Sequence, residues 1–256
     1  CEIYCFIESE GDGIDVVHYY LGDKKSYVCL GWPTELSFDL AIATIAHSAK
    51  HISKMKNVKH KAYLVQDFEA WFNPVGDKYS SNENSYTYGM LHFTVGKFLT
   101  HVLTHQYSAK AVPSGLGVDR SIYYDKEEQR EEAICFLYQP EKDRRNPKLA
   151  INALKIVKQN NPDVKIYVYG SNAEIELDFE VENLGLIREL SELNDLYNKC
   201  KVGLCISMSN PSRIPFEFMS AGVVPVDIYR YNNLLDYPTG TIKLAYQSHE
   251  SIAEAI

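Results

Sequence analysis

Residues 209–226 read SNPSRIPFEFMSAGVVPV, a proline-bounded loop followed by a short helical stretch, a glycine and a β-branched run. A loop, a helix and a strand in this order are typical of a parallel α/β sheet. Pro215 suits the first helical position, which leaves Ile214 as the capping residue, and isoleucine has no side-chain oxygen to bind the first amides. We therefore predict unoccupied amides at this helix start, which in an α/β domain favour an anion such as phosphate.

Glu217 lies in the first turn of this predicted helix, and it has two interpretations. A carboxylate at a helix N-terminus is stabilised by about 0.3 to 1 kcal/mol, so a purely structural role explains the residue. The alternative is a glutamate that binds the ligand held at the helix start. The residues alone leave both interpretations open.

Short β-rich runs and helical stretches alternate on both sides of residues 209–226, which predicts two Rossmann-like α/β domains. We assign residues 1–118 to an N-terminal domain and residues 119–256 to a C-terminal domain. Residues 114–131 have two glycines and many charges without an apolar period, which predicts a linker. The predicted strands are 38–44, 61–68, 91–95, 109–114, 133–139, 164–170, 202–207 and 223–229, and the predicted helices are 47–57, 96–108, 147–160, 191–200 and 215–221.

The composition argues against several classes of protein. With 26 Lys and Arg against 34 Asp and Glu, the formal charge of -8 argues against nucleic-acid binding, which needs clustered basic residues. The six cysteines form no CxxC pair, so we expect reduced core cysteines in a cytoplasmic protein. No apolar run approaches the ~20 residues of a membrane span, and no signal segment is evident. Because the chain opens on Cys1 and stops mid-pattern, we expect a fragment of a longer protein.

Ligands of open parallel sheets bind beyond the carboxyl ends of the strands, and three loops of the C-terminal half offer candidates there. Residues 140–146, PEKDRRN, carry Arg144 and Arg145, whose guanidinium groups can bind a diphosphate. A solvated basic turn is the alternative. Gly170 permits a ligand to approach the backbone beside Ser171, although plain turn chemistry also explains this glycine. The third loop follows the predicted strand 202–207 and begins the stretch 209–226 quoted above.

The N-terminal half offers the chemistry of a sugar site. Asp67 and Glu69 follow a predicted strand, and the next loop carries Trp71 and further aromatic residues. Carboxylates accept hydrogen bonds from sugar hydroxyls while rings cover the apolar faces of the sugar. A loop packed on its own rings is the alternative. His47 also follows a strand, so it either faces the cleft between the domains or is structural.

Several catalytic motifs are missing from the sequence. There is no GxSxG, HExxH, P-loop or GxGxxG motif, which argues against hydrolases, zincins, NTPases and simple dehydrogenases. His101 and His105 are four residues apart, as metal ligands can be, but no third ligand is evident and we assign them to one helix face. The interpretation that remains is a diphosphate-binding site in the C-terminal half that faces a sugar-binding site in the N-terminal half.

At residues 210–226, the sequence NPSRIPFEFMSAGVVPV resembles the second half of the glutamate motif of retaining glycosyltransferase family 4. HFTVGKFLTHVL and VPSGLGVDRSIYY are similar to a helix and a Gly-Val-Asp hinge of that family, FLYQPEKDRRNPKLAINAL to its diphosphate loop, and NLGLIRELSELNDLYNKCKVGLCIS to its base-binding segment. Within the family, DLAIATIAHSA and YLVQDFEAWFNPVGDKY resemble bacterial rhamnosyltransferases of the WsaF type. The resemblance implies the GT-B fold, in which two Rossmann-like domains face each other across a cleft.

The resemblance also implies roles for individual residues on the donor side. Glu217 is expected to bind the ribose hydroxyls, and Arg145 or Arg144 to neutralise the diphosphate. The residues expected to contact the donor are Arg144, Arg145, Gly170, Ser171, Ser212, Arg213, Ile214 and Glu217, and Arg145 and Glu217 are the two assigned to catalysis. The residues expected to contact the acceptor are His47, Asp67, Glu69 and Trp71.

Two positions depart from the family pattern. The first glutamate of the motif falls on Ser209, and Gln139 stands where many members carry an arginine. The contact that the first glutamate makes to the donor sugar is therefore missing from this position, and the cation must come from Arg144 or Arg145.

We expect a retaining, metal-independent glycosyltransferase that needs no cofactor. The donor is expected to be a nucleoside-diphosphate sugar, with dTDP-L-rhamnose as the first choice, and the acceptor a cell-surface polysaccharide or a lipid-linked glycan. The expected location is the cytoplasm, with at most peripheral contact to the inner face of the membrane. Two alternatives stay open: a nucleotide-sugar-binding module without turnover, and a GT-B epimerase or phosphorylase.

Overall fold

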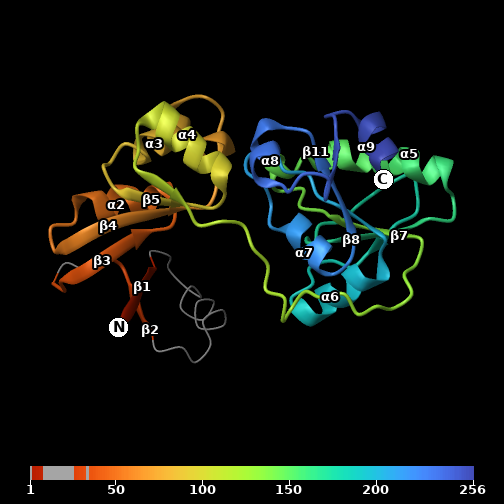
Figure 1. Ribbon diagram of the computed structural model, residues 1–256, viewed down its shortest axis with the longest axis horizontal. Coiled ribbons are helices and arrows are strands. Elements are labelled where there is room, and N and C mark those ends of the chain that lie inside the picture. The colour runs from red at the N-terminus through yellow and green to blue at the C-terminus, as the bar shows by residue number, and fades with distance from the viewer. Residues whose placement is uncertain (1, 8–25, 33–34) are drawn as a thin grey trace.

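The computed structural model describes residues 2–7, 26–32 and 35–256. Figure 1 shows two α/β lobes joined by an extended segment that leads from strand β6 (Ala111–Pro113) to strand β7 (Ala133–Leu137). All of the strand pairs in the described residues are parallel. The predicted α/β class is therefore confirmed.

The C-terminal lobe contains a six-stranded sheet with the order β12-β11-β10-β7-β8-β9. The chain enters at β7 in the middle of the sheet, adds two strands on one side, and then crosses to β10 on the other side. Every residue of β7 is buried, as expected of a parallel strand with helices on both faces. The other strands are β8 (Lys165–Tyr169), β9 (Glu182–Asn183), β10 (Val202–Leu204), β11 (Val224–Ile228) and β12 (Lys243–Ala245).

Helices cover the two faces of this sheet because successive side chains of β7 point to opposite sides. Ile134 and Phe136 pack in the core cluster that includes residues of α5 (Pro147–Asn160) and α9 (His249–Ala255). Cys135 and Leu137 pack in the cluster that includes residues of α6 (Leu190–Lys199) and α7 (Ile214–Ser220). The short helix α8 (Tyr231–Asp236) follows β11.

The N-terminal lobe has a four-stranded sheet in the order β3-β4-β5-β6, and β1 (Ile3–Ile7) pairs with β2 (Ser26–Leu30) in a separate small sheet. Helices α2, α3 and α4 cover one face of the larger sheet in Figure 1. Tyr63, Tyr86 and Leu99 are among the buried residues between sheet and helices. The elements are β3 (Phe38–Ala43), α2 (Ala46–Lys54), β4 (Val58–Val65), the 3-10 helix η1 (Glu69–Phe72), α3 (Asp77–Ser85), β5 (Leu91–Thr94) and α4 (Lys97–Tyr107).

Only the first part of the predicted linker, residues 114–131, connects the two lobes. Between β6 and β7 the chain has no helix or strand, but Tyr123 is 5% exposed and packs in the C-terminal core. Arg130 donates to the backbone carbonyls of Tyr197, Cys200 and Ala221 at 3.1, 3.0 and 2.6 Å. The segment from Tyr123 onward therefore belongs to the C-terminal lobe, and the linker between the lobes is shorter than predicted.

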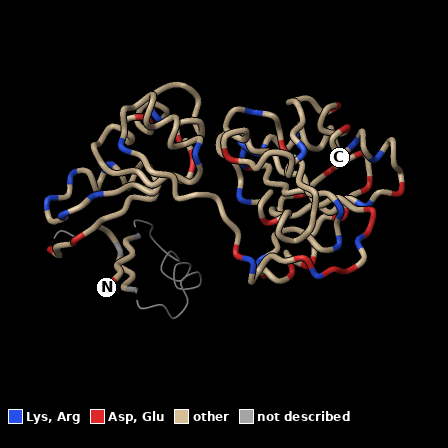
Figure 2. The backbone as a smooth tube through the Cα atoms, in the orientation of Figure 1, with Lys and Arg blue, Asp and Glu red and all other residues tan. Residues whose placement is uncertain are grey.

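Charge and cysteine distribution agree with an ordinary folded protein. Figure 2 shows basic and acidic positions interspersed along the C-terminal lobe. Cys135, Cys200 and Cys205 are buried free thiols, while Cys1 lies outside the described residues. None of the helices in the described part of the chain has the length and apolar character needed to cross a bilayer.

Candidate functional site between the two domains

The strand order of the C-terminal sheet places two loops side by side. β7 and β10 are neighbours, but the chain leaves β7 toward β8 and leaves β10 toward β11, so the loops after them diverge to opposite sides. Such a switch point opens a crevice at the carboxyl ends of the strands. The loop after β7 carries Arg144 and Arg145, and the loop after β10 runs from Cys205 to Arg213.

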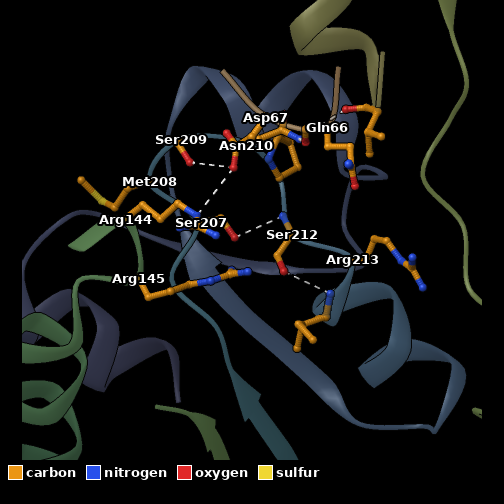
Figure 3. Close-up of a pocket in the computed structure, with 13 residues that line it drawn as sticks. Gln66, Asp67, Arg144, Arg145, Ser207, Met208, Ser209, Asn210, Ser212 and Arg213 are labelled. Atoms are coloured by element: carbon orange, nitrogen blue, oxygen red, sulfur yellow. Dashed lines mark hydrogen bonds and ion pairs between the residues drawn. The ribbon is translucent and has the colours of Figure 1, made fainter. Parts of the chain in front are cut away.

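A pocket of about 290 Å³ lies at this switch point, and residues of the N-terminal domain line one side of it. Figure 3 shows side chains from both domains around it. The N-terminal domain contributes residues that follow β4 and β5. The lining residues are Gln66, Asp67, Val95, Arg144, Arg145, Ser207, Met208, Ser209, Asn210, Pro211, Ser212, Arg213 and Ile214.

Asp67 is the carboxylate of this lining, and it contacts the opposite domain. Ser209 Oγ donates to Asp67 Oδ2 at 3.1 Å, and Arg144 Nε lies 3.7 Å from the same oxygen. Burial raises the pKa of Asp67 to about 6, although Ser209 and Arg144 act in the opposite direction. Arg144 also places its guanidinium 4.6 Å from the centre of the Phe72 ring, a cation-π contact. The predicted diphosphate ligand Arg144 and the predicted acceptor ligand Asp67 thus meet in one site.

Asn210 holds the two domains together through backbone carbonyls. Its Nδ2 donates to Gln66 O at 3.0 Å and to Val95 O at 3.3 Å. Both partners are acceptors, so the orientation of the amide is fixed and Oδ1 points away from them. Oδ1 is buried and has no partner in the described residues, which costs about 1 to 3 kcal/mol of stability.

Arg145 lies deeper in the pocket wall than Arg144. Its Nη1 donates to the Sγ of the buried Cys205 at 3.4 Å, while its buried Nε has no partner within the described chain. A thiol is a weak acceptor, so this guanidinium retains hydrogen-bonding capacity for an anion in the pocket. The predicted diphosphate loop is thus at the pocket, and the solvated-turn alternative does not describe Arg145.

The floor of the pocket is fixed by a buried polar network on Asp227. This fully buried carboxylate accepts hydrogen bonds from Ser207 N at 2.9 Å and from Tyr237 OH at 2.7 Å. Burial raises the pKa of Asp227 to about 6. Ser207 Oγ in turn accepts from Ser212 N at 3.3 Å. The network therefore sets the path of the 207–212 loop.

The start of helix α7 differs from the sequence prediction. Arg213, not Ile214, is the capping residue. Ile214 N donates to Ser212 Oγ at 3.2 Å, and Phe216 N and Glu217 N donate to Arg213 O at 3.0 and 3.2 Å. The prediction of unoccupied amides is wrong for these residues, because a serine two positions before Ile214 supplies the oxygen that isoleucine lacks.

Glu217 is buried behind the pocket wall. The pocket lining ends at Ile214, and Glu217 lies one helical turn further on with 6% of its surface exposed. Tyr197 OH donates to Oε2 at 3.5 Å, and Arg213 Nη2 lies 3.9 Å from Oε1. Burial raises the pKa of Glu217, with Arg213 acting in the opposite direction. A ribose can reach this carboxylate only if neighbouring side chains move.

Comparisons with known proteins agree with this geometry. Residues 132–256 match the family described as WsaF, C-terminal domain. The C-terminal domain is therefore similar to the C-terminal domain of WsaF. This match confirms the resemblance to the WsaF type that the sequence motifs indicate.

The O-antigen biosynthesis protein RfbC of Myxococcus xanthus is 29% identical to the chain over 198 residues, which are 73% of this chain and 15% of RfbC. The chain therefore spans a small part of this relative. HepE of Anabaena, solved in complex with UDP, matches 99% of the chain over 88% of its own length with a TM-score of 0.69 and 12% identity. A glycosyltransferase of Rickettsia africae matches 99% of the chain over 86% of its own length with a TM-score of 0.67 and 12% identity. These likenesses show the GT-B fold.

Two further donor-side predictions lie in the loop after β8 of the WsaF-type domain, outside the lining of the pocket. Gly170 has a φ of +107°, and a Cβ there would lie 2.7 Å from Leu137 Cδ1. Ser171 Oγ accepts from Ala173 N at 3.2 Å. Backbone conformation and packing therefore account for the glycine, and a contact of either residue with the donor stays a prediction.

Two other residues predicted to contact the acceptor, Glu69 and His47, lie outside the lining of the pocket. Both oxygens of Glu69 are engaged within the domain, Oε1 by Tyr63 OH at 2.8 Å and Oε2 by Ala46 N at 2.9 Å at the start of helix α2. This geometry favours a structural glutamate over an acceptor ligand. His47 is exposed with its ring 4.6 Å from that of His51, and it lies outside the pocket lining.

The sequence left two interpretations of the aromatic loop open, a loop packed on its own rings and a loop whose rings face a sugar. Some of its rings are buried and others are exposed. Tyr86 is 1% exposed and belongs to the core, whereas Trp71 and Phe72 are 42% and 44% exposed.

His101 and His105 lie on one face of α4, with ring centres 4.2 Å apart, as predicted. In the described residues no group of three or more His, Cys, Asp and Glu side chains is arranged to hold a metal ion.

Three residues of the site were missed from the sequence. Asn210 and Ser207 were not singled out, although both lie in loops after strands, where ligands were sought. Asp236, the last residue of helix α8, was also missed because that helix was not predicted. A search for short polar side chains in every loop after a strand would have found the first two.

Proposed function

We propose that this chain forms part of a glycosyltransferase that moves a sugar from a nucleoside-diphosphate donor to a glycan acceptor. The observation that carries the proposal is the interdomain pocket, in which Arg144 and Arg145 lie opposite Asp67. Arginines are suited to a diphosphate, and a carboxylate to sugar hydroxyls. The match of the C-terminal domain to that of WsaF and the GT-B fold support the same activity.

The donor diphosphate is proposed to bind Arg145 and Arg144. In the unliganded site Arg144 faces Asp67 at 3.7 Å, so an incoming diphosphate competes with this carboxylate for the guanidinium. As the sugar–phosphate bond breaks, negative charge grows on the leaving diphosphate, and both guanidinium groups stabilise it without a metal ion. Glu217 is proposed to bind the ribose after a side-chain rearrangement, since it is buried in the unliganded protein.

Asp67 is proposed to bind the hydroxyl group of the acceptor. It is the carboxylate that the N-terminal domain presents to the pocket, and its partner Ser209 occupies the position where family 4 carries the first motif glutamate. A carboxyl with a pKa of about 6 can accept a hydroxyl hydrogen bond at neutral pH. The acceptor carboxylate thus comes from the opposite domain.

The proposed donor is dTDP-L-rhamnose, and the proposed acceptor is a cell-surface polysaccharide or a lipid-linked glycan. The WsaF-type motifs support the sugar, and the relative named for O-antigen biosynthesis supports the acceptor. Transfer with retention of configuration is proposed because the motif resembles that of retaining glycosyltransferase family 4. A cytoplasmic location, with at most peripheral contact to the membrane, agrees with a nucleotide-sugar donor.

A panel of nucleotide sugars tests this proposal. The chain is incubated with dTDP-rhamnose, UDP-glucose, UDP-N-acetylglucosamine and GDP-mannose, with and without EDTA, and release of the nucleoside diphosphate is measured. We expect turnover of one donor that EDTA does not reduce. Loss of activity on chelation, restored by Mg²⁺ or Mn²⁺, would contradict the metal-free mechanism, and an epimerised sugar would indicate a different reaction.

The second candidate is a nucleotide-sugar-binding module without turnover. Ser209 favours it, because a hydroxyl replaces the motif carboxylate and binds Asp67 at 3.1 Å. Binding of a nucleoside diphosphate without hydrolysis or transfer, with every acceptor tried, would support the module over the enzyme.

A further inference from the structure

Aromatic rings from both domains form a continuous cluster across the domain boundary. The Trp71 and Phe98 ring centres are 5.9 Å apart, those of Phe98 and Tyr231 are 6.3 Å apart, and those of Tyr231 and His101 are 5.7 Å apart. Trp71, Phe98 and His101 belong to the N-terminal domain, and Tyr231 begins helix α8 of the C-terminal domain. We call these four residues the interdomain ring cluster.

Two members of the interdomain ring cluster are partly exposed to solvent, and the ring between them is buried. Trp71 is 42% and Tyr231 is 54% exposed, whereas Phe98, which contacts both, is 3% exposed. Phe98 therefore anchors the cluster in the core of the N-terminal domain, and the two larger rings present part of their surface to solvent. Rings held by a buried neighbour lose little conformational freedom when a ligand binds them.

Sequence neighbours of two cluster residues contact residues that line the interdomain pocket. Phe72, the neighbour of Trp71 in sequence, is 44% exposed and lies under the guanidinium of Arg144, which lines the pocket. On the other side, Asn232, the neighbour of Tyr231 in sequence, donates from Nδ2 to Ser207 O at 3.2 Å, and Ser207 also lines the pocket. Figure 1 shows helices α4 and α8, which carry the remaining rings, facing each other from the two lobes.

Polar groups accompany the rings. His101 is exposed, and His105 beside it has its Nδ1 2.8 Å from His101 O. A ring nitrogen that faces a carbonyl must donate, so in the neutral imidazole Nε2 is left as an acceptor. The hydroxyl of Tyr231 adds a group that both donates and accepts. Apolar faces bordered by such groups suit a saccharide, which has C–H faces and a rim of hydroxyls.

We propose that the interdomain ring cluster binds the sugar units of an acceptor glycan chain next to the unit that enters the pocket. This inference rests on the proposed function and adds a binding site for several sugar units outside the pocket. Because Tyr231 and Trp71 come from different domains, an acceptor chain on the cluster contacts both and favours the arrangement in which both domains line the pocket.

The experiment measures glycan binding separately from donor binding. An array of bacterial O-antigen and capsular oligosaccharides is probed with the chain, and one oligosaccharide that binds is titrated in several lengths by tryptophan fluorescence and calorimetry. We expect affinity to increase with chain length, and to fall at least tenfold in Trp71→Ala and in Tyr231→Ala. Tyr231→Phe keeps the ring and should lose less than threefold.

The control variant is Tyr246→Ala, which removes a 72% exposed ring that contacts Tyr229 outside the cluster. It should bind glycans and dTDP, UDP and GDP as the parent chain does. Melting curves check that each variant is folded. Unchanged glycan affinity in folded Trp71→Ala and Tyr231→Ala, or no oligosaccharide bound by the parent chain, would overturn the proposal. Glycan binding without any nucleotide binding would instead keep the ring cluster and contradict the proposed transferase.

Discussion

The carboxylate of Asp236 in the C-terminal domain caps helix α4 of the N-terminal domain, accepting from Lys97 N at 2.6 Å and Phe98 N at 3.0 Å. A Cβ on the preceding residue, Gly96, would lie 2.7 Å from this carboxylate, so a glycine is needed for the close approach. An anion at a helix N-terminus is favoured by the helix dipole and the unpaired amides. Within the described residues, this cap joins the two domains together with the polar contacts of Asn210 and Asp67.

Replacing Asp236 with alanine should destabilise the arrangement of the two domains. Loss of a helix cap typically lowers stability by about 0.5 to 2 kcal/mol, and here the loss also removes a contact between domains. We expect a lower melting temperature and a larger radius of gyration in small-angle scattering. Asp236→Asn, which can still cap the helix, should lie close to the parent chain. A radius of gyration unchanged in Asp236→Ala would show that the other contacts are sufficient.

Asp67→Asn should stabilise the protein at high pH. The pKa of Asp67 is about 6 in the folded protein, above its ordinary value of 3.8, so ionisation favours the unfolded chain. The stability that the protonated carboxyl contributes is present below pH ~4 and is lost as the pH rises through ~6. Asparagine cannot ionise, so we expect a gain of about 1 to 3 kcal/mol at pH 8 that disappears near pH 4.

Denaturant unfolding at a series of pH values measures this difference. Asp39→Asn is the control, because Asp39 is exposed and the hydrogen bond from Lys59 lowers its pKa. The control should show no gain at pH 8. If Asp67→Asn were instead less stable than the parent chain at pH 8, the ion pair with Arg144 would outweigh the effect of burial.

Sequence patterns predicted the positions of most strands and helices between residues 38 and 228, because the hydrophobic period changes clearly from strand to helix there. The aromatic loop was harder to predict. Helix α3 has the sequence DKYSSNENS, which lacks an apolar stripe, so its helical conformation comes from tertiary contacts. The short elements α8 and β12 gave equally little periodic signal.

The candidate site was predictable where it depends on strand ends, and not where it depends on the approach of the two domains. Arg144, Arg145 and Asp67 follow strands, and a parallel sheet brings such positions to one edge. The Ser209–Asp67 hydrogen bond joins residues 142 positions apart. It depends on how the domains meet, which no local pattern encodes. Glu69 likewise resembles a ligand in sequence, but its partners Tyr63 and Ala46 are visible only in the fold.

Arg145→Ala should weaken the binding of nucleoside diphosphates. Its guanidinium lines the pocket and has a weak thiol as a partner, so a diphosphate would add charged hydrogen bonds worth about 1.5 to 3 kcal/mol. Calorimetric titration with dTDP, UDP and GDP measures the loss. Arg120→Ala, at an exposed position in the linker, is the matched control and should bind as the parent chain does. Undiminished affinity in a folded Arg145→Ala would assign the diphosphate to Arg144.

Glu217→Gln separates the two roles that remain for the buried glutamate. A structural glutamate loses only an electrostatic interaction of at most about 1 kcal/mol, and ligand affinity stays the same. A glutamate that binds the ribose accepts two hydroxyl hydrogen bonds, which an amide only partly replaces, so nucleotide affinity should fall by about 1.5 to 3 kcal/mol. We expect the second result, with little change in the affinity for inorganic pyrophosphate, which has no ribose.

Calorimetry with a nucleoside diphosphate and with pyrophosphate, together with a melting curve, distinguishes the possible outcomes for Glu217→Gln. Equal losses for both ligands would mean that the variant disturbs the start of helix α7, where Arg213 lies 3.9 Å from the carboxylate. Unchanged affinity for both ligands would leave Glu217 as a structural residue. Burial raises the pKa of Glu217, so its ionised form is the less favourable one in the fold. This cost of ionisation offsets part of the lost electrostatic interaction, so the variant should stay within about 1 kcal/mol of the parent chain in stability. A loss of nucleotide affinity alone would then reflect the lost contact with the ribose.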